Sequence, residues 1–141
     1  MKLELKHLSI YLPYDLQIIR VLSPIKNEKN IMTGITEKGI FYNQYSHVPY
    51  NHIKPILRPL EDLFFNLSIK NENQKPFEYL EDFADTETER MFLDIIENQN
   101  TKFILEKIQY APLSFIQKLL EWHFDIFGLI NAKLAVDINC L

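Results

Sequence analysis

The chain has 141 residues, of which 47% are hydrophobic and 13% aromatic, and its formal net charge is −4. These apolar residues suffice for a core, so we expect one folded domain over residues 1–141 rather than a disordered chain. The acidic balance disfavours a nucleic-acid-binding surface. No run approaches the roughly 18 apolar residues that a membrane span requires.

The location of the protein is predicted from its ends. The only cysteine, Cys140, cannot form an internal disulfide, which is typical of a reducing compartment. Charged residues at positions 2, 4 and 6 interrupt the apolar stretch that a signal peptide needs. We therefore expect a cytoplasmic protein without membrane attachment.

Residues 1–58 predict mainly β-structure after a short helix or turn that ends near Pro13. The β-branched run 16–22 (LQIIRVL) predicts a strand, and residues 24–30 predict a polar loop. Residues 31–36 and 40–45 predict two further strands, joined by a hairpin loop in which Gly39 takes positive φ.

The next segment is rich in proline. Prolines at positions 49, 55 and 59 lack the N–H that a strand ladder uses. The segment is therefore predicted to be an edge strand or a loop and not a central strand.

From Pro59 onwards the pattern is helical. Leu60, Leu63, Phe64 and Leu67 keep helical spacing for about two turns. Residues 70–75 predict a polar connector, and Pro76 opens a helix over 76–83 with Phe77, Leu80 and Phe83 on one side. Residues 101–110 predict a short helix or a strand.

Thr86 and Glu89 form a capping-box pattern that predicts another helix start, with the helix ending near Asn98. This helix is expected to bury four apolar residues, Met91, Phe92, Ile95 and Ile96.

The clearest helix is predicted between Pro112 and a left-handed cap at Gly128. Its polar side chains fall within one narrow stripe: Ser114, Gln117, Lys118, Glu121 and Asp125. The other side chains are almost all apolar, so the helix is predicted to be buried on several sides, with Trp122 in the core. His123 is interpreted as a core or boundary residue. Residues 134–138 (LAVDI) predict a last strand that joins the N-terminal sheet.

The predicted fold class is therefore α+β. We expect a small antiparallel sheet, built from the N-terminal part and the C-terminal strand, packed on a mainly helical C-terminal half.

The strongest electrostatic signal is an acidic segment. Residues 78–97 contain eight carboxylates and one base, Arg90, which leaves a formal charge of −7 while the rest of the chain carries +3. One interpretation is a solvated helix face. A second is a docking surface for a basic protein partner, with six candidate residues: Glu78, Glu81, Asp82, Asp85, Glu87 and Glu89. A third is a set of spaced carboxylates of a metal-dependent nuclease, which is disfavoured because nothing places a lysine and a path for the nucleophile beside them.

A second candidate contact is the proline-broken segment with Tyr45, His47, Tyr50 and His52. Two imidazoles do not make a zinc site, which needs three or four ligands, so we expect no metal. Arg58, flanked by proline, is either a recognition residue or a partner for Glu61 or Asp62. With three glycines in the chain, phosphate-binding loops are excluded, and we expect no catalytic residues and no cofactor.

Four pieces of the sequence are similar to a known group: MKLELKHL followed by YLPY, then IKPILRPLEDL, KLLEWHFDIFGLI and a closing DIN. They resemble small uncharacterised proteins of bacteriophages and prophages of Bacteroidetes-type bacteria. The resemblance covers residues 1–16, 53–63 and 117–139, and Asp15 stands where glycine is expected. It implies a phage or mobile-element origin and transfers no functional residues.

These observations predict a non-enzymatic phage or prophage accessory protein that binds a protein of the host cell, such as a defence or nucleic-acid-handling protein, through its acidic face. A structural or assembly component of the virion and an enzyme acting on nucleic acid or a nucleotide are the alternatives. The oligomeric state is left open.

Overall fold

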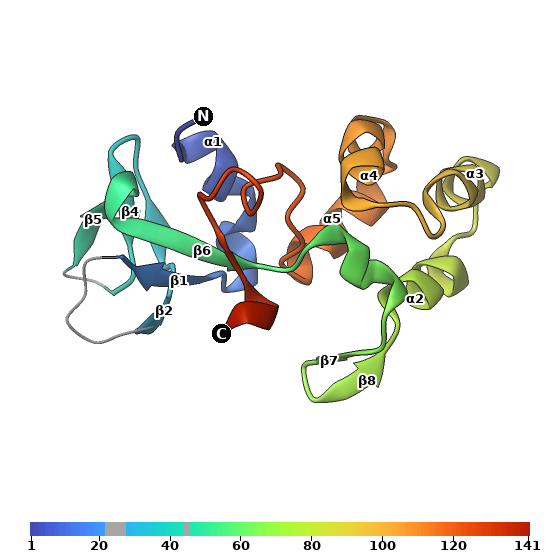
Figure 1. Ribbon diagram of the computed structural model, residues 1–141, viewed down its shortest axis with the longest axis horizontal. Helices are drawn as coiled ribbons and strands as arrows, with labels where there is room; N and C mark the ends of the chain where they lie inside the picture. Colours follow the sequence, from blue (N-terminus) through green and yellow to red (C-terminus); the bar gives the residue numbers. More distant parts are fainter. Residues whose placement is uncertain (22–27, 44–45) are drawn as a thin grey trace. The chain divides into compact units, whose positions relative to one another are not determined.

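The computed structural model describes residues 1–21, 28–43 and 46–141, and it confirms the predicted α+β class (Figure 1). The chain forms two compact units. Unit 1 comprises Met1–Arg58 and Phe127–Leu141, and unit 2 comprises Pro59–Ile126. Whether the two units behave as the single domain expected above stays a prediction.

Unit 1 begins with the expected helical segment, formed by α1 (Leu5–Leu8) and the 3-10 helix η1 (Ser9–Tyr14). Asp15 ends it with a φ of 54°, in the left-handed region that short polar side chains tolerate best after glycine. Leu8 and Tyr11 are fully buried, so this segment contributes to the core of unit 1.

The larger sheet of unit 1 has the strand order β2-β1-β6-β9. Its strands are β1 (Gln17–Arg20), β2 (Lys29–Ile31), β6 (Ile53–Leu57) and β9 (Val136–Asp137). The predicted strand 16–22 is thus confirmed in its described part, and the C-terminal strand joins the N-terminal sheet as expected. The sheet is nevertheless mixed and not antiparallel, because β9 runs parallel to β6.

The proline-rich segment was wrongly predicted to lack a central strand. β6 contains Pro55 and lies between β1 and β9. Val21 N donates to His52 O, so Val21 and His52 are a hydrogen-bonded pair of the β1–β6 ladder. Hydrogen-bonded and non-hydrogen-bonded pairs alternate along an antiparallel ladder. The pair Ile18–Pro55, three positions further along, is therefore a non-hydrogen-bonded pair. The missing N–H of Pro55 therefore costs no bond to β1. The register with β9 begins only at Ile56.

The smaller sheet of unit 1 contains β3 (Gly34–Ile35), β4 (Gly39–Phe41) and β5 (His47–Pro49), with β4 in the centre. The predicted strand 31–36 is divided between β2 and β3. Gly39 does not take the positive φ that we expected. Glycine is needed at this position for another reason, because a Cβ there would lie 2.1 Å from Val48 O on β5.

Unit 2 opens with the 3-10 helix η3 (Leu60–Phe64), shorter than the predicted two turns, followed by β7 (Leu67–Ile69) and β8 (Glu72–Gln74). The predicted polar connector 70–75 is therefore wrong. Lys70 and Asn71, with φ of 52° and 65°, form the tight turn of a β-hairpin, because two residues with positive φ match the twist of the paired strands.

The helices of unit 2 are α2 (Pro76–Phe83), α3 (Glu87–Ile96), α4 (Thr101–Lys107) with the 3-10 turn η4 (Ile108–Tyr110), and α5 (Leu113–Glu121). The predicted helix over 76–83 is confirmed, as is the capping box at Thr86. Side chains from all of these α-helices form the buried cluster, which includes Leu80, Phe92, Ile104 and Phe115.

The predicted core faces of α2 and α3 are partly wrong. α3 buries Phe92 and Ile96 as expected, but it buries Leu93 in place of the two other predicted residues. Met91 and Ile95 are 56% and 46% exposed. On α2, Phe77 and Leu80 are buried and Phe83 is exposed.

The last helix ends at Glu121 and not at the predicted Gly128. His123 takes a φ of 62°, while its N–H bonds to Leu120 O and the N–H of Phe124 bonds to Leu119 O. This pair of bonds is a Schellman motif, in which a left-handed residue terminates the helix. Trp122 is 5% exposed, as predicted, but Asp125 is 4% exposed and does not belong to a solvated stripe.

Candidate functional site

Five exposed carboxylates lie along α2, the connection that follows it and the start of α3. We call them the acidic surface: Glu78, Glu81, Asp82, Asp85 and Glu87. Glu78 and Glu87 occupy the first turns of their helices, where the helix dipole favours negative charge. The helix dipoles therefore stabilise part of this charge.

The charge of the acidic surface is almost unneutralised. Within the described residues, one cation lies within ion-pair distance of it: Lys75, whose Nζ is 3.7 Å from Glu78 Oε1. The side chains of Lys75 and Glu78 are 36% and 67% exposed, so solvent screens this pair and it contributes little. Taken as a whole, unit 2 has six basic and fourteen acidic residues, a formal charge of −8, whereas unit 1 has nine and five, a charge of +4.

Glu89, the sixth predicted residue, has an internal role. Its side chain is 8% exposed, and Oε1 accepts hydrogen bonds from the N–H and the hydroxyl of Thr86. Oε2 accepts a third from the hydroxyl of Ser114 on α5 at 3.0 Å. Hydrogen bonds from Thr86, then from Ser114, lower the pKa of this carboxyl. Glu89 therefore caps α3 and ties it to α5, so we leave it out of the acidic surface.

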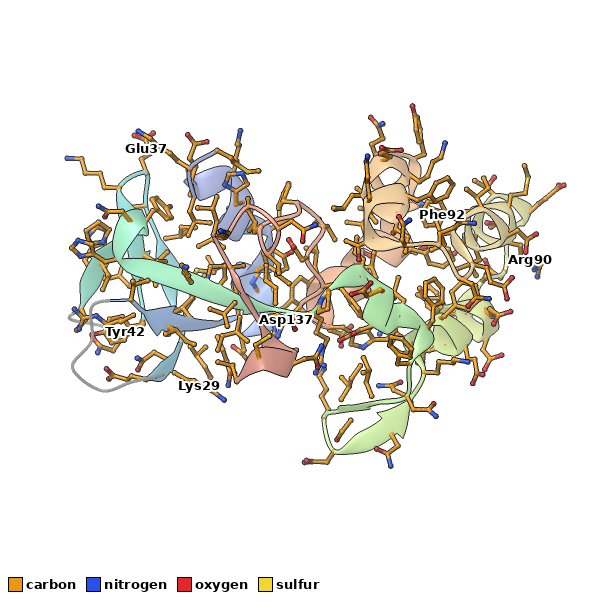
Figure 2. The ribbon with its side chains drawn as sticks, in the orientation of Figure 1. Lys29, Glu37, Tyr42, Arg90, Phe92 and Asp137 are labelled. Atoms are coloured by element: carbon orange, nitrogen blue, oxygen red, sulfur yellow. The ribbon has the colours of Figure 1, made fainter. Side chains whose placement is uncertain are left out.

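A shallow groove of about 330 Å³ lies beside the acidic surface, lined by Phe77, Glu81, Arg90, Leu93 and Asp94. Figure 2 shows Arg90 projecting outwards from α3, whereas Phe92 lies towards the interior, with its ring centroid 6.1 Å from that of Phe115. The groove adds one carboxylate, Asp94, to the acidic side of α3. Its apolar lining is provided by Phe77 and Leu93.

Met91 and Ile95 are the contact candidates that sequence reasoning missed. Residues four apart share a helix face, so Glu87, Met91 and Ile95 form one exposed stripe on α3. The buried residues Phe92, Leu93 and Ile96 occupy the opposite side. The periodicity of α3 contained this signal, because no single arc of the helix holds all five apolar residues.

The histidine and tyrosine candidates mostly hold unit 1 together. The hydroxyl of Tyr50, which is 9% exposed, donates to the backbone oxygen of Thr36, and burial raises the pKa of this phenol. His47 Nε2 lies 2.9 Å from Thr36 Oγ1. His52 is half-buried in the 3-10 turn η2 (Tyr50–His52), and Tyr45 lies outside the described residues. Among the described residues, His47 and Tyr50 therefore meet at Thr36, but Tyr50 is too buried to serve as an exposed contact.

Two arginines of unit 1, Arg20 and Arg58, have interactions of their own. Arg20 Nη1 lies 3.3 Å from the hydroxyl of Tyr42, and its guanidinium lies 5.9 Å from the centre of that ring. Arg58 follows β6 directly, is half-buried and has an interaction of its own. Neither arginine belongs to the acidic surface.

Two features are absent from residues 1–21, 28–43 and 46–141, the ranges that the structure describes. No three His, Cys, Asp or Glu side chains there are grouped so that they could hold a metal ion. No helix in those ranges combines the length and apolar character needed to cross a membrane.

The chain was also compared with known proteins. Neither protein-family models, nor curated proteins, nor solved structures gave a match to it. The resemblance to phage proteins consequently stays a prediction.

Proposed function

We propose that the protein is a non-enzymatic binding protein that holds a basic protein partner on unit 2. One observation carries the proposal: five exposed carboxylates lie on α2, the connection after it and the start of α3, with one weak ion pair among the described residues. One of these carboxylates, Glu87, shares its face of α3 with the exposed apolar side chains of Met91 and Ile95. Protein interfaces commonly combine an apolar centre with a polar rim. Met91 and Ile95 supply the apolar centre, and the acidic surface supplies the polar rim.

The chemistry of the partner follows from this arrangement. An amphipathic basic segment would place its lysines or arginines on the carboxylates and its apolar side chains on Met91 and Ile95. The charge would mainly accelerate association and select the partner, while the apolar contacts would slow dissociation.

The resemblance to phage proteins supports a partner inside an infected bacterial cell. Proteins that bind nucleic acid carry basic surfaces for the phosphates. A host defence or nucleic-acid-handling protein is therefore the partner class that we propose.

A defined peptide tests the acidic surface directly. A synthetic helix with lysines on one face and leucines on the other should bind, as measured by calorimetry, whereas its glutamate analogue should not. Reversing Glu81, Asp82 and Asp85 to lysine should weaken binding by roughly tenfold or more, since each close charge pair contributes about 0.2–1 kcal/mol and repulsion is added.

The matched control is the triple reversal of Glu61, Glu72 and Glu106, which are exposed in unit 2 outside the acidic surface and change the net charge equally. An equal loss in both triple variants would show that only overall charge matters and would reject the surface. Met91→Ser with Ile95→Ser should raise the dissociation rate of the peptide, and an unchanged rate would remove the apolar stripe from the interface.

A further inference from the structure

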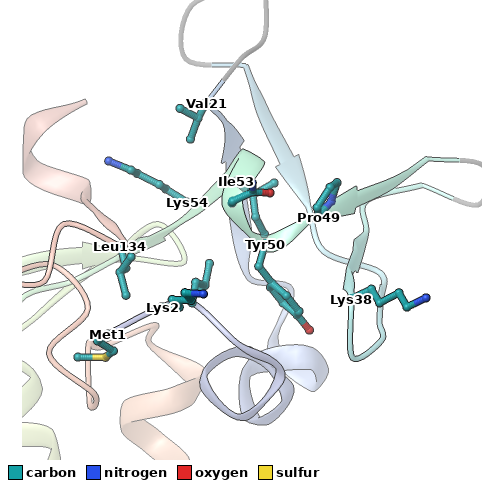
Figure 3. A pocket seen from close by; sticks show the side chains of 11 residues that line it. Met1, Lys2, Val21, Lys38, Pro49, Tyr50, Ile53, Lys54 and Leu134 are labelled. Atoms are coloured by element: carbon teal, nitrogen blue, oxygen red, sulfur yellow. The ribbon is translucent and has the colours of Figure 1, made fainter.

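We propose that unit 1 contains a second binding site, which takes a small amphipathic carboxylate. The site is a pocket of about 600 Å³ (Figure 3). It is formed by segments that are far apart in the sequence: the start of the chain, the end of β1, the β3–β4 turn, β6 and the segment before β9. Its size lies within the range of about 300–1,000 Å³ that is typical of small-molecule sites.

The base of the pocket is apolar and built into the fold. Leu3, Tyr50 and Ile53 line it and are 7%, 9% and 2% exposed. Tyr50 is held in place because its hydroxyl donates to the backbone oxygen of Thr36. Leu134 adds an apolar wall from the C-terminal segment. An apolar ligand body would therefore meet a preformed surface, and would not have to order it.

The charged groups of the pocket are all positive. Lys2, Lys38 and Lys54 line it, and no aspartate or glutamate within residues 1–21, 28–43 and 46–141 does. In the described part of the chain, none of these three ammonium groups has an ion pair or a side-chain hydrogen bond. Figure 3 shows Lys54 and Lys2 on one side of the pocket and Lys38 on the other, with Tyr50 between them.

This combination defines the ligand class. Lysine ammonium groups recognise charge without the planar geometry of an arginine fork, so they do not require a bidentate phosphate. Apolar lining dominates the base, and a ligand made mostly of charge would lose solvation there without compensation. A monoanion with an apolar body fits both conditions, and we assign the site to carboxylates with a short alkyl or aryl body.

Octanoate is a suitable probe, with 1-octanol as its uncharged analogue and inorganic phosphate as an anion that has no apolar body. In a ¹⁵N NMR titration, the backbone amide shifts of Leu3, Tyr50, Ile53 and Leu134 should saturate with octanoate. The protein should bind octanol more weakly than octanoate. Phosphate should give no saturable shift. The absence of saturation with octanoate, or equal affinity for octanol, would overturn the assignment.

Variants separate the pocket from general charge. Lys2→Gln with Lys54→Gln should weaken octanoate binding by roughly three- to tenfold, the effect expected of partly exposed charges, and should leave octanol binding unchanged. Lys29→Gln with Lys133→Gln removes the same charge from exposed positions of unit 1 that do not line the pocket, and should leave octanoate binding unchanged. Equal losses in both pairs would reject the site. The outcome is independent of peptide binding by unit 2.

Discussion

Units 1 and 2 differ in charge, in architecture and in the surface that they present. Unit 1 has a formal charge of +4, contains both larger sheets and has an apolar pocket lined by lysines. Unit 2 has a charge of −8, is mainly helical and exposes carboxylates beside Met91 and Ile95. The net charge of −4 therefore describes neither unit. It suggests that the protein has no basic surface, and this holds only for unit 2.

The two units are also stabilised differently. In unit 2, local signals such as the Thr86–Glu89 capping box define where helices begin. In unit 1, the decisive contacts join residues distant in sequence, such as the close approach of Gly39 to the backbone of Val48 and the parallel pairing of β9 with β6. Changes in each unit should therefore act by different mechanisms.

The largest expected effect is the loss of a buried aromatic side chain from unit 2. Trp122→Ala should lower the free energy of unfolding by about 3–5 kcal/mol, because it removes a large buried side chain and leaves a cavity. Denaturant titration followed by far-UV circular dichroism measures the loss. In unit 1, Leu16→Ala at a fully buried position should cost about 2–5 kcal/mol.

Denaturant titrations of the unaltered protein test whether the units unfold together. Trp122 is the only tryptophan, so its fluorescence reports unit 2 alone, whereas circular dichroism reports both units. Coincident transitions are expected for the single domain predicted from the sequence. Two separate transitions would contradict that prediction.

A smaller effect is expected at the crowded glycine of unit 1. Gly39→Ala should destabilise the protein by about 1–3 kcal/mol, because the new Cβ must displace backbone atoms of β5. Gly34→Ala is the matched control on the neighbouring strand, where the nearest atom would be a side-chain carbon of Phe41 at 3.4 Å. Thermal or chemical unfolding of the two variants should give clearly different losses; similar values would exclude the backbone contact as the cause.

The cap of α3 provides the corresponding test in unit 2. Thr86→Ala removes the side-chain acceptor for the N–H of Glu89 and should cost about 1 kcal/mol of unfolding free energy. Thr88→Ala, at an exposed position inside the same helix, should have little effect. A loss that is no larger at position 86 than at position 88 would show that the cap is unimportant.

The smallest expected effect is a dependence on pH in unit 1. His7 is 3% exposed, its Nδ1 accepts from the N–H of Glu4, and burial followed by the charge of Lys6 lowers its pKa. The unfolded chain therefore binds a proton more readily than the folded one, so stability is complete above pH 6.5 and falls as the pH drops below it. His7→Gln should flatten this part of a stability–pH profile, and a profile identical to that of the unaltered protein would contradict the assignment.

Several elements followed from the sequence because their signals are local. Pro76 begins α2, Thr86 and Glu89 begin α3, and the β-branched run around Ile18 forms β1. The acidic surface was also predicted, since clustered exposed carboxylates are visible in the order of residues. Only Glu89 was misplaced, because its second oxygen bonds to Ser114, which is 25 residues away.

Other features were decided by tertiary structure alone. His123 ends α5 in a left-handed conformation that glycine normally adopts, so the residue type at this position does not predict the end of the helix. Pro55 fits in a central strand because it falls at a non-hydrogen-bonded position of the ladder with β1, and this position depends on the register of the two strands. The pocket of unit 1 requires residues from both ends of the chain. The sequence by itself determined where helices start, the α+β class and the acidic segment, because propensity and capping act over a few residues. Register, helix face and pocket depended on long-range packing, which no short pattern contains.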